Sequence, residues 1–184
     1  MLVLASRSPR RAQLLSMITN EFKIIPSEFD EKTIAESSPI LLVERLASEK
    51  AKAVYKDIDK NDIVIGSDTV VIVNNQILGI PKNQQDAYNM ISMLSGKTHT
   101  VATGVSIISQ NVDKSFVSQT KVKFFDLTQQ EIKEYISTSE PYDKAGGYGI
   151  QGKAALFIEE IQGDYYSVMG LPIARLKKEL SALI

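Results

Sequence analysis

The fold is decided by the stretch Asp62–Val73, which reads DIVIGSDTVVIV. Its two apolar runs, 63–65 and 70–73, are uninterrupted and favour a strand that is buried on both faces. A sheet of this kind is covered by helices, so we expect an α/β protein. The polar segment Gly66–Thr69 is unexpected there, and we expect the strand to stop at this segment and then resume.

Asp68 is the candidate for chemistry in this stretch. Burial of a carboxylate in an apolar strand is costly unless the group is paired, hydrogen-bonded or bound to a metal. In the alternative interpretation, Asp68 satisfies backbone groups where the strand bends at Gly66. The residue therefore marks either a reacting site or a bend in the sheet.

The chain begins with a strand, a turn and a helix. Apolar residues 2–5 precede the turn Ser6–Arg11, in which Ser8 is a good N-cap. Pro9 suits the first helical position. The turn carries three arginines, no acidic residue precedes Glu21, and a helix N-terminus already has positive partial charge. Such a turn suits an anion such as a phosphate chain, and a solvated surface turn is the alternative.

Turn signals and periodicity place the other elements. Asn74-Asn75 predicts a tight hairpin turn, Thr128 with Glu131 forms a capping box, and Gly96 ends the clearest amphipathic helix. We expect strands at 22–25, 76–78, 98–108, 115–125, 155–161 and 165–169, and helices that open after Ser38, Asn83 and Thr128 and at about Pro172. The chain lacks repeats and linkers, so we expect residues 1–184 to form a single domain, with two lobes around a cleft.

Two loops carry further candidates. The acidic loop 27–32 reads as a solvated loop by itself, but Glu31 together with Asp68 could hold a hard divalent cation through oxygen ligands. The loop Asp143–Gly152 contains a literal G-x-G-x-x-G without a strand before it or a helix after it, so it is not a dinucleotide fingerprint. Its glycines predict a sharp turn or a close approach to a ligand, with Lys144 and Gln151 as the delivered side chains.

Other polar and aromatic residues favour structural roles. His99 is the sole histidine, and we expect a hydrogen-bonded strand residue rather than a catalytic one. Tyr165 and Tyr166 are expected in core and strand packing rather than in base stacking.

Composition describes an ordinary globular chain. Of 184 residues, 43% are hydrophobic and 23% charged, which supports a core without a disulfide or structural metal. The 21 basic and 22 acidic residues balance, which disfavours a nucleic-acid partner; such a partner would bind the Arg-rich turn in a salt-dependent way. The absence of cysteine excludes thiolate chemistry. No stretch resembles a secretory signal or a membrane span, so we expect a cytoplasmic protein without a membrane partner.

Five motifs, in order along the chain, resemble those of the Maf family of nucleoside triphosphate pyrophosphatases. They are ASRSPRR at Ala5–Arg11, GSDTV at Gly66–Val70, LSGKTH at Leu94–His99, DKAGGYGIQG at Asp143–Gly152 and GDYYSVMGLP at Gly163–Pro172. The resemblance covers nearly the whole chain. It implies a fold like that of the inosine triphosphate pyrophosphatases, an elongated, twisted mixed sheet flanked by helices, with a nucleotide cleft between two lobes.

The resemblance also implies hydrolysis of a nucleoside triphosphate to the monophosphate and pyrophosphate, with a divalent cation (Mg²⁺, Mn²⁺ or Co²⁺). Asp68 matches the proton acceptor of the family. With Glu31, Asp68 would coordinate the cation and activate the water. Ser6, Arg11 and Lys50 also match functional positions, and we expect them on the phosphates.

Three positions separate the branches of the family. One branch acts on dTTP and UTP and another on 7-methyl-GTP, and Arg10, Thr69 and Gln151 are the states of the dTTP/UTP branch. An amide such as that of Gln151 can donate and accept toward a uracil or thymine edge.

One departure from the family pattern concerns a phosphate-side lysine. The family often has Gly-Lys-Pro before the third helix, whereas this chain has Gly79-Ile80-Pro81, with Lys82 two residues later. Lys82 either reaches the same phosphate from a shifted position or leaves that contact absent.

The resemblance leaves one alternative function open. A nucleotide-binding regulator of cell division and septum formation, with little hydrolysis, would keep the same residues for affinity. The partner is a nucleoside triphosphate in both cases. A homodimer is compatible with either, and the sequence settles neither the preferred metal nor whether the pyrimidine is ordinary or modified.

Overall fold

The computed structural model describes residues 1–36 and 38–183. Two compact units are found, and each is assembled from separate segments of the chain. Unit 1 contains Met1–Thr69, Thr103–Ser118 and Gly170–Ile184, and unit 2 contains Val70–Ala102 and Gln119–Met169.

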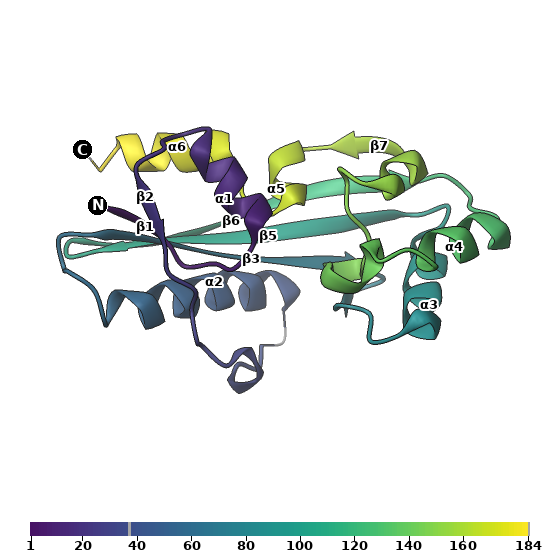
Figure 1. Cartoon of the computed structure of the whole chain (residues 1–184), viewed down its shortest axis with the longest axis horizontal. Coiled ribbons are helices and arrows are strands. Elements are labelled where there is room, and N and C mark those ends of the chain that lie inside the picture. Colours follow the sequence, from purple (N-terminus) through teal and green to yellow (C-terminus); the bar gives the residue numbers. More distant parts are fainter. Residues whose placement is uncertain (37, 184) are drawn as a thin grey trace. The chain divides into compact units, whose positions relative to one another are not determined.

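The strands of the described residues form a mixed sheet of seven strands, with the order β2-β1-β3-β5-β6-β7 and with β4 paired to β3 (Figure 1). β1 pairs in parallel with both β2 and β3, whereas β3 with β4 and β6 with β7 are antiparallel. The long strands β3, β5 and β6 contribute residues to both units. Their bounds are β1 (Leu2–Leu4), β2 (Phe22–Ile24), β3 (Ile63–Val73), β4 (Gln76–Leu78), β5 (Thr98–Ser109), β6 (Val112–Phe124) and β7 (Ile158–Gln162).

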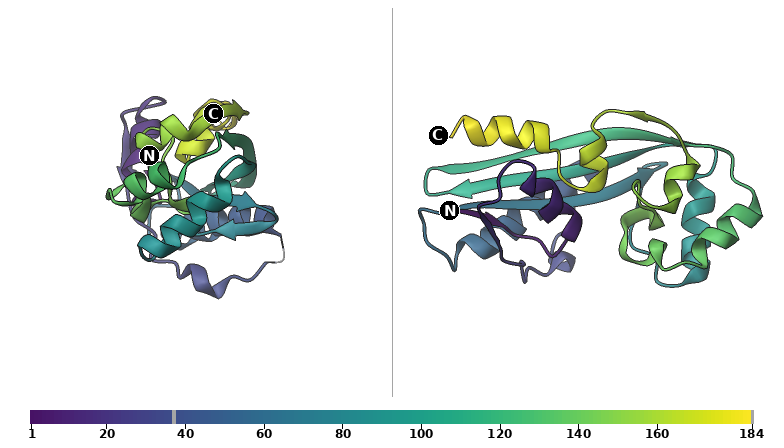
Figure 2. Two further views of the ribbon diagram at one scale, coloured as in Figure 1. Left: turned by 90° about the vertical axis from the view of Figure 1, so that its right-hand side faces the viewer. Right: turned by 45° about the horizontal axis from the view of Figure 1, so that its top comes forward.

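Helices cover both faces of the sheet in unit 1. They are α1 (Pro9–Ser16), α2 (Pro39–Tyr55) and α6 (Ile173–Ser181). Figure 1 shows α1 and α6 on one side of the sheet and α2 on the other, and Figure 2 gives two further views. Gly66 of β3 packs against α2, whereas the next residue, Ser67, is bonded to the carbonyl of Gly170. The side chains of successive strand residues point to opposite faces. The expected α/β architecture, with a buried central strand, is therefore confirmed.

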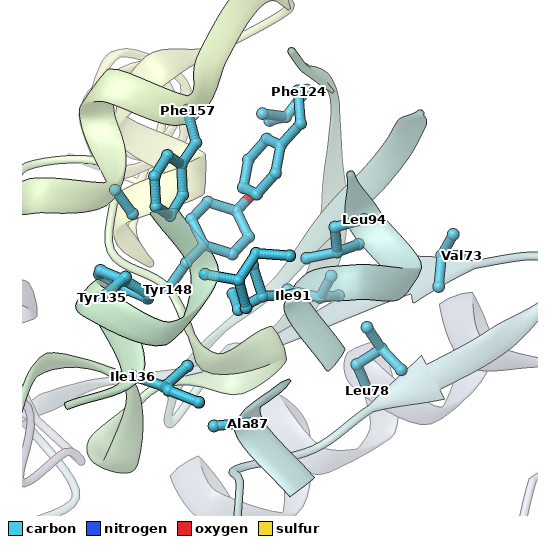
Figure 3. Close-up of a cluster of buried hydrophobic side chains, with 14 of the residues drawn as sticks. Val73, Leu78, Ala87, Ile91, Leu94, Phe124, Tyr135, Ile136, Tyr148 and Phe157 are labelled. Carbon is cyan, nitrogen blue, oxygen red and sulfur yellow. The ribbon is translucent and has the colours of Figure 1, made fainter. Parts of the chain in front are cut away.

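Unit 2 packs helices α3 (Gln84–Leu94) and α4 (Gln129–Ile136) around an aromatic core. Phe124, Ile91 and Leu94 are fully buried there, and Tyr135, Tyr148 and Phe157 belong to the same cluster (Figure 3). The rings meet edge to face, as Phe124 and Tyr148 do at 4.9 Å between centroids, which is a favoured geometry. Short 3₁₀ turns, η2 (Glu140–Asp143), η3 (Ala145–Gly147) and η4 (Lys153–Phe157), and the helix α5 (Tyr165–Met169) belong to the same unit.

The local signals in the sequence are confirmed at helix starts and at the hairpin. The side chains of Ser8 and Asn83 accept the backbone N–H groups of Arg11 and Asp86, and both bonds of the Thr128 capping box are present. Asn74 and Asn75 have φ values of 50° and 61°, which suits a two-residue hairpin turn.

Three predictions of strands need correction. The strand does not stop at 66–69, because β3 continues through Val73 with its polar side chains bonded inside the protein. The predicted strand at 165–169 is helix α5, because Asp164 caps it by accepting the N–H of Tyr166 at 2.8 Å. Tyr165 is consequently exposed rather than in the core. The strand expected at 155–161 starts later, since residues 153–157 form η4.

None of the helices in the part of the chain that the structure describes is long and apolar enough to cross a membrane.

Candidate active site

The candidate site lies in unit 1, where the parallel pairing of β1 with β2 and β3 ends. Leu4 of β1 is in register with Ile24 of β2 and with Ile65 of β3, so the residues after these three positions meet at one edge of the sheet. The strand order reverses at β1, and such a switch point is the usual ligand position of open α/β sheets. A pocket of about 440 Å³ opens here, lined by Ala5–Ser8, Arg11, Ser27–Phe29, Glu31 and Lys50.

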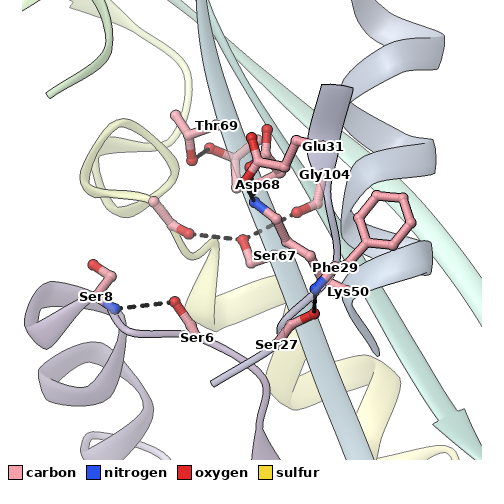
Figure 4. A network of polar contacts seen from close by, with 12 residues as sticks. Ser6, Ser8, Ser27, Phe29, Glu31, Lys50, Ser67, Asp68, Thr69 and Gly104 are labelled. Atoms are coloured by element: carbon pink, nitrogen blue, oxygen red, sulfur yellow. Dashed lines mark hydrogen bonds and ion pairs between the residues drawn. The ribbon is translucent and has the colours of Figure 1, made fainter. Parts of the chain in front are cut away.

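A lysine between two carboxylates is the central feature of the site (Figure 4). The Nζ atom of Lys50 lies 2.5 Å from Asp68 Oδ1 and 2.6 Å from Glu31 Oε1. Asp68 comes from β3, Glu31 from the 3₁₀ turn η1 (Glu31–Thr33) and Lys50 from α2. The structure therefore brings together three of the residues that the resemblance implied.

Two glycines explain how Lys50 reaches the strand. A Cβ on Gly66 would lie 2.2 Å from the carbonyl oxygen of Ala47, and one on Gly104 of β5 would lie 2.4 Å from that of Val43. Only glycine allows the backbone of α2 to pack this close to the sheet. Ala47 and Lys50 are one turn apart on α2, so this contact delivers the Lys50 ammonium to Asp68.

The two ion pairs of Lys50 differ in burial. The side chains of Lys50 and Asp68 are 14% and 12% exposed, whereas that of Glu31 is 55% exposed. A pair removed from water is stable only when both charges stay matched. The Asp68–Lys50 pair is therefore largely withdrawn from water, whereas Glu31 is the more open of the two carboxylates.

The first turn is ordered by its serines. The Oγ atom of Ser6 accepts the backbone N–H of Ser8 at 3.2 Å, and Ser8 Oγ accepts the N–H of Arg11 at 3.4 Å. Two backbone N–H groups that could have bound an anion are therefore already bonded to serine hydroxyls. An anion at this turn would be bound mainly by the arginine side chains.

Arg11 ties this turn to two other segments. Its Nε donates to the carbonyl of Gly170 at 2.9 Å, its Nη1 to Ser6 Oγ at 3.3 Å and its Nη2 to Thr69 Oγ1 at 3.1 Å. Burial lowers the pKa of the guanidinium, and the Asp68 carboxylate opposes that shift. An arginine has five N–H groups, so these bonds leave donor capacity for a ligand in the pocket.

Thr69, which is expected to take part in base selection, has two hydrogen-bond partners in the structure. Its Oγ1 accepts from Arg11 and lies 2.9 Å from Oγ1 of Thr103. The hydroxyl therefore orients Arg11 on the face of β3 opposite to Asp68.

The other two arginines of the turn differ from Arg11. Arg7 pairs with Glu28 at 2.6 Å on the surface, and both side chains are mostly exposed. Arg10 is half-buried in the first turn of α1 and does not line the pocket.

Lys82 and Gln151 belong to unit 2. Both are exposed, and the backbone N–H of Lys82 donates to Asp86 Oδ2 at 3.0 Å. Ile80, at the position where the family often has lysine, is 55% exposed.

Sequence reasoning missed three residues that organise the site. The Ser67 hydroxyl shares its one proton between the carbonyls of Gly104 and Gly170, at 3.0 and 2.9 Å, and Thr103 supports Thr69. Gly170 has a φ of 113°, which favours glycine and directs its carbonyl to Arg11. Ser67 and Gly170 lie within the quoted motifs, but their partners are more than 30 residues away, so no local pattern could identify them.

His99 is a structural residue, as expected. Its Nε2 lies 2.7 Å from the hydroxyl of Tyr148, and its ring packs edge to face against Phe124. Burial lowers the pKa of the imidazole to about 4, so the ring is neutral at pH 7.

Comparison with known proteins adds sequence relatives along nearly the whole chain. A dTTP/UTP pyrophosphatase of Bacillus cereus is 50% identical over 179 residues, which are 97% of this chain and 93% of the relative. A dTTP/UTP pyrophosphatase of a Geobacillus species is 51% identical over 182 residues, which are 99% and 97% of the two chains.

Solved structures with the same fold are much more distant in sequence. The Ham1 protein of Staphylococcus aureus has a TM-score of 0.59 at 16% identity, covering 100% of this chain and 99% of its own. A nucleoside-triphosphatase, dITP/XTP pyrophosphatase, of Mycobacterium abscessus has a TM-score of 0.50 at 11% identity, covering 100% and 97%. The model of the Maf-like protein family matches residues 1–183, and with half of all positions shared with the relatives above, the chain belongs to the Maf family.

Proposed function

We propose that this protein is a nucleoside triphosphate pyrophosphatase that hydrolyses dTTP and UTP to the monophosphate and pyrophosphate. The observation that carries the proposal is the Lys50 ammonium held between Asp68 and Glu31 beside a pocket with an arginine-bearing turn. Relatives with half of their residues in common bear the name dTTP/UTP pyrophosphatase.

The phosphate side of the reaction is served by cations on the pocket wall. Arg11, Ser6 and Lys50 line the same pocket, and a triphosphate needs its charge neutralised before a water can attack it. Arg11 is held by protein contacts before a ligand arrives, so little ordering is required on binding. Lys82 is the candidate for a further phosphate contact, because Ile80 stands where the family often has a lysine.

Asp68 is the proton acceptor. One water adds across the bond between the α-phosphorus and the bridging oxygen of the pyrophosphate, that bond breaks, and the water proton passes to the carboxylate. Oδ1 of Asp68 is bonded to Lys50, which leaves the second oxygen for the proton.

A divalent cation fits the two carboxylates of the site. Glu31 and Asp68 already converge on one positively charged nitrogen, and no group of three or more candidate ligands is found among the described residues. Mg²⁺ is commonly held by one or two carboxylates together with substrate phosphates, which matches this donor set better than a permanent metal centre would. When bound, such a cation supplies charge neutralisation for the phosphates and polarises a water.

Base selection rests with Arg10, Thr69 and Gln151, the three positions that match the dTTP/UTP branch. Gln151 supplies an amide that donates and accepts toward the pyrimidine edge. Thr69 accepts a hydrogen bond from Nη2 of Arg11, so it acts by orienting that guanidinium.

Pyrophosphate release from a panel of nucleoside triphosphates, with Mg²⁺ or Mn²⁺, tests the proposal. We expect dTTP and UTP to be preferred, and Asp68→Asn to lower turnover by about 10³-fold with dTTP binding retained. Asp113→Asn is the matched control, since Asp113 is an exposed carboxylate of the same unit that lies 3.5 Å from Lys52.

Two outcomes would contradict the proposal. Wild-type turnover in the Asp68→Asn variant removes Asp68 from catalysis. Tight dTTP binding without pyrophosphate release from any substrate favours the nucleotide-binding regulator instead.

A further inference from the structure

The glycine-rich segment of unit 2, residues 140–154, is tied together by the half-buried side chain of Glu140. Its Oε2 accepts the backbone N–H of Lys153 at 2.8 Å, and its Oε1 accepts the N–H of Ala154 at 3.3 Å. The hydroxyl of Tyr135 shares its one proton between the same carboxylate, at 3.2 Å, and the carbonyl of Gly147, at 3.1 Å. One side chain at the start of the segment thus closes the chain back on itself 13 residues later.

The glycines of the segment follow from this closure. A Cβ on Gly152 would lie 2.3 to 2.5 Å from the atoms of the Glu140 carboxylate. A Cβ on Gly149 would lie 2.7 Å from Cε of Lys144, whose Nζ donates to the carbonyl of Glu140 at 2.8 Å. The literal G-x-x-G at these positions therefore makes room for Glu140 and Lys144. The sequence predicted a sharp turn or a close approach to a ligand here, and the contacts seen at Gly149 and Gly152 are with the protein's own side chains.

Three donors surround the Glu140 carboxylate. Two N–H groups and one O–H group converge on it, and a carboxylate accepts with both oxygens. Burial, with the Glu140 charge as the next cause, raises the pKa of the Tyr135 hydroxyl, which therefore remains a donor. A glutamine at this position would turn an NH₂ group toward a backbone N–H and leave both unsatisfied.

Gln151 lies inside the closed segment. It is exposed, two residues before Lys153, and it is followed by Gly152 against the Glu140 carboxylate. A free chain of this composition would let Gln151 adopt many positions, whereas the tie restricts the backbone on its C-terminal side.

We propose that Glu140 is a positioning residue that holds Gln151 in place and thereby sets the selection for pyrimidine triphosphates. The inference rests on the proposed function, in which Gln151 contacts the base. Glu140 itself touches backbone amides of the segment, so its effect on substrate passes through Gln151.

A double-mutant cycle with Glu140→Gln and Gln151→Ala tests the inference, with Glu159→Gln as the control. Glu159 is a carboxylate of the same unit, but it pairs with the side chain of Lys123 at 2.9 Å rather than with backbone amides. We expect Glu140→Gln to raise the KM for dTTP about tenfold, to change kcat by less than about threefold, and to reduce the preference for dTTP over dGTP.

The second arm of the cycle separates positioning from general stability. In the Gln151→Ala background, we expect Glu140→Gln to change the KM by less than about twofold, because the positioned side chain is gone. The inference would be overturned if the two substitutions multiplied each other's effects on the KM for dTTP. It would also be overturned if Glu140→Gln lowered the melting temperature but left the KM and the preference for dTTP unchanged.

The same experiment distinguishes this inference from the proposed function. A wild-type protein that releases no pyrophosphate overturns the proposed function. The role of Glu140 is then decided by measuring the dissociation constant for dTTP by calorimetry in the same set of variants. Absence of dTTP binding overturns both.

Discussion

Lys50 in unit 1 and Glu140 in unit 2 each gather several groups of opposite polarity, but their partners differ in kind. Lys50 bonds two carboxylate side chains, one of them largely exposed. Glu140 bonds two backbone N–H groups and a tyrosine hydroxyl. The first arrangement joins side chains from three elements, and the second closes a single segment on itself.

The difference shows which charges a ligand can redistribute. A carboxylate such as Glu31 can exchange an ammonium for a metal ion, and the ammonium can then turn to a phosphate, so that no charge is left unpaired. The backbone N–H groups of Lys153 and Ala154 would lose the acceptor that Glu140 provides, and nothing about a ligand would replace it. We therefore expect Lys50 to take part in the reaction, and Glu140 to fix the conformation of the glycine-rich segment.

The largest effect is expected from Lys50→Met, which shortens the unbranched side chain by one atom and removes its charge. Turnover of dTTP should fall about 1,000-fold, because both a phosphate contact and the partner of Asp68 are lost. Without nucleotide, calorimetry should detect tighter Mn²⁺ binding than in the wild type, because the ammonium no longer competes for Glu31 and Asp68.

Lys52→Met is the matched control for this variant. It lies two residues further along α2, and its side chain is 42% exposed. Mn²⁺ affinity that is equal in the wild type and Lys50→Met would show that the two carboxylates are not the cation site.

The next effect concerns the exposed end of the closed segment. Gln151→Glu should shift the ratio of kcat/KM for dTTP over dCTP by about 100-fold toward dCTP, because a carboxylate only accepts and repels the O4 of thymine. Steady-state kinetics with both substrates measures the shift. Gln76→Glu, at an exposed site in β4, is the control, and an unchanged ratio in Gln151→Glu would remove Gln151 from base selection.

The smallest effect concerns a second tie of the glycine-rich segment, between His99 and Tyr148. Burial lowers the pKa of His99 from its usual 6.5 to about 4, so between these values the unfolded chain binds more protons than the folded one. Stability contributed by neutral His99 is present above pH 6.5 and is lost as the pH falls toward 4. Between pH 7 and pH 5 the loss should be about 2 kcal/mol in the free energy of unfolding.

Urea unfolding of the wild type and of His99→Gln at the two pH values measures this loss. The glutamine can still reach Tyr148 but does not titrate, so the variant should lack that share of the pH dependence. Equal pH dependence in both proteins would show that His99 does not titrate on unfolding.

Much of the site was predictable from sequence. A carboxylate in a buried strand is costly unless it is paired, which identified Asp68 as a candidate, and the structure pairs it with Lys50. Ser8 and Pro9 marked the start of α1 from local chemistry alone. The choice of Lys50, among many lysines, came from the family resemblance, because no local pattern distinguishes it from Lys52.

The errors share a physical cause. Polar residues 66–69 predict a break in the strand when they are considered alone, but in the fold Ser67, Asp68 and Thr69 each find a partner from another element. The run at 165–169 has an apolar pattern compatible with a strand, and the cap at Asp164 makes it a helix instead. Short segments are ambiguous until their hydrogen-bond partners are known.

The sequence by itself determined the α/β class, the helix starts, the hairpin turn and the candidate residues, because these depend on side-chain chemistry and on spacing along a few residues. Only the tertiary structure decided that Gly66 and Gly104 bring α2 onto the sheet, that Lys50 lies between Asp68 and Glu31, and that Glu140 closes the glycine-rich segment. Such contacts join residues far apart in the chain, and they form only when packing brings two backbones within van der Waals distance.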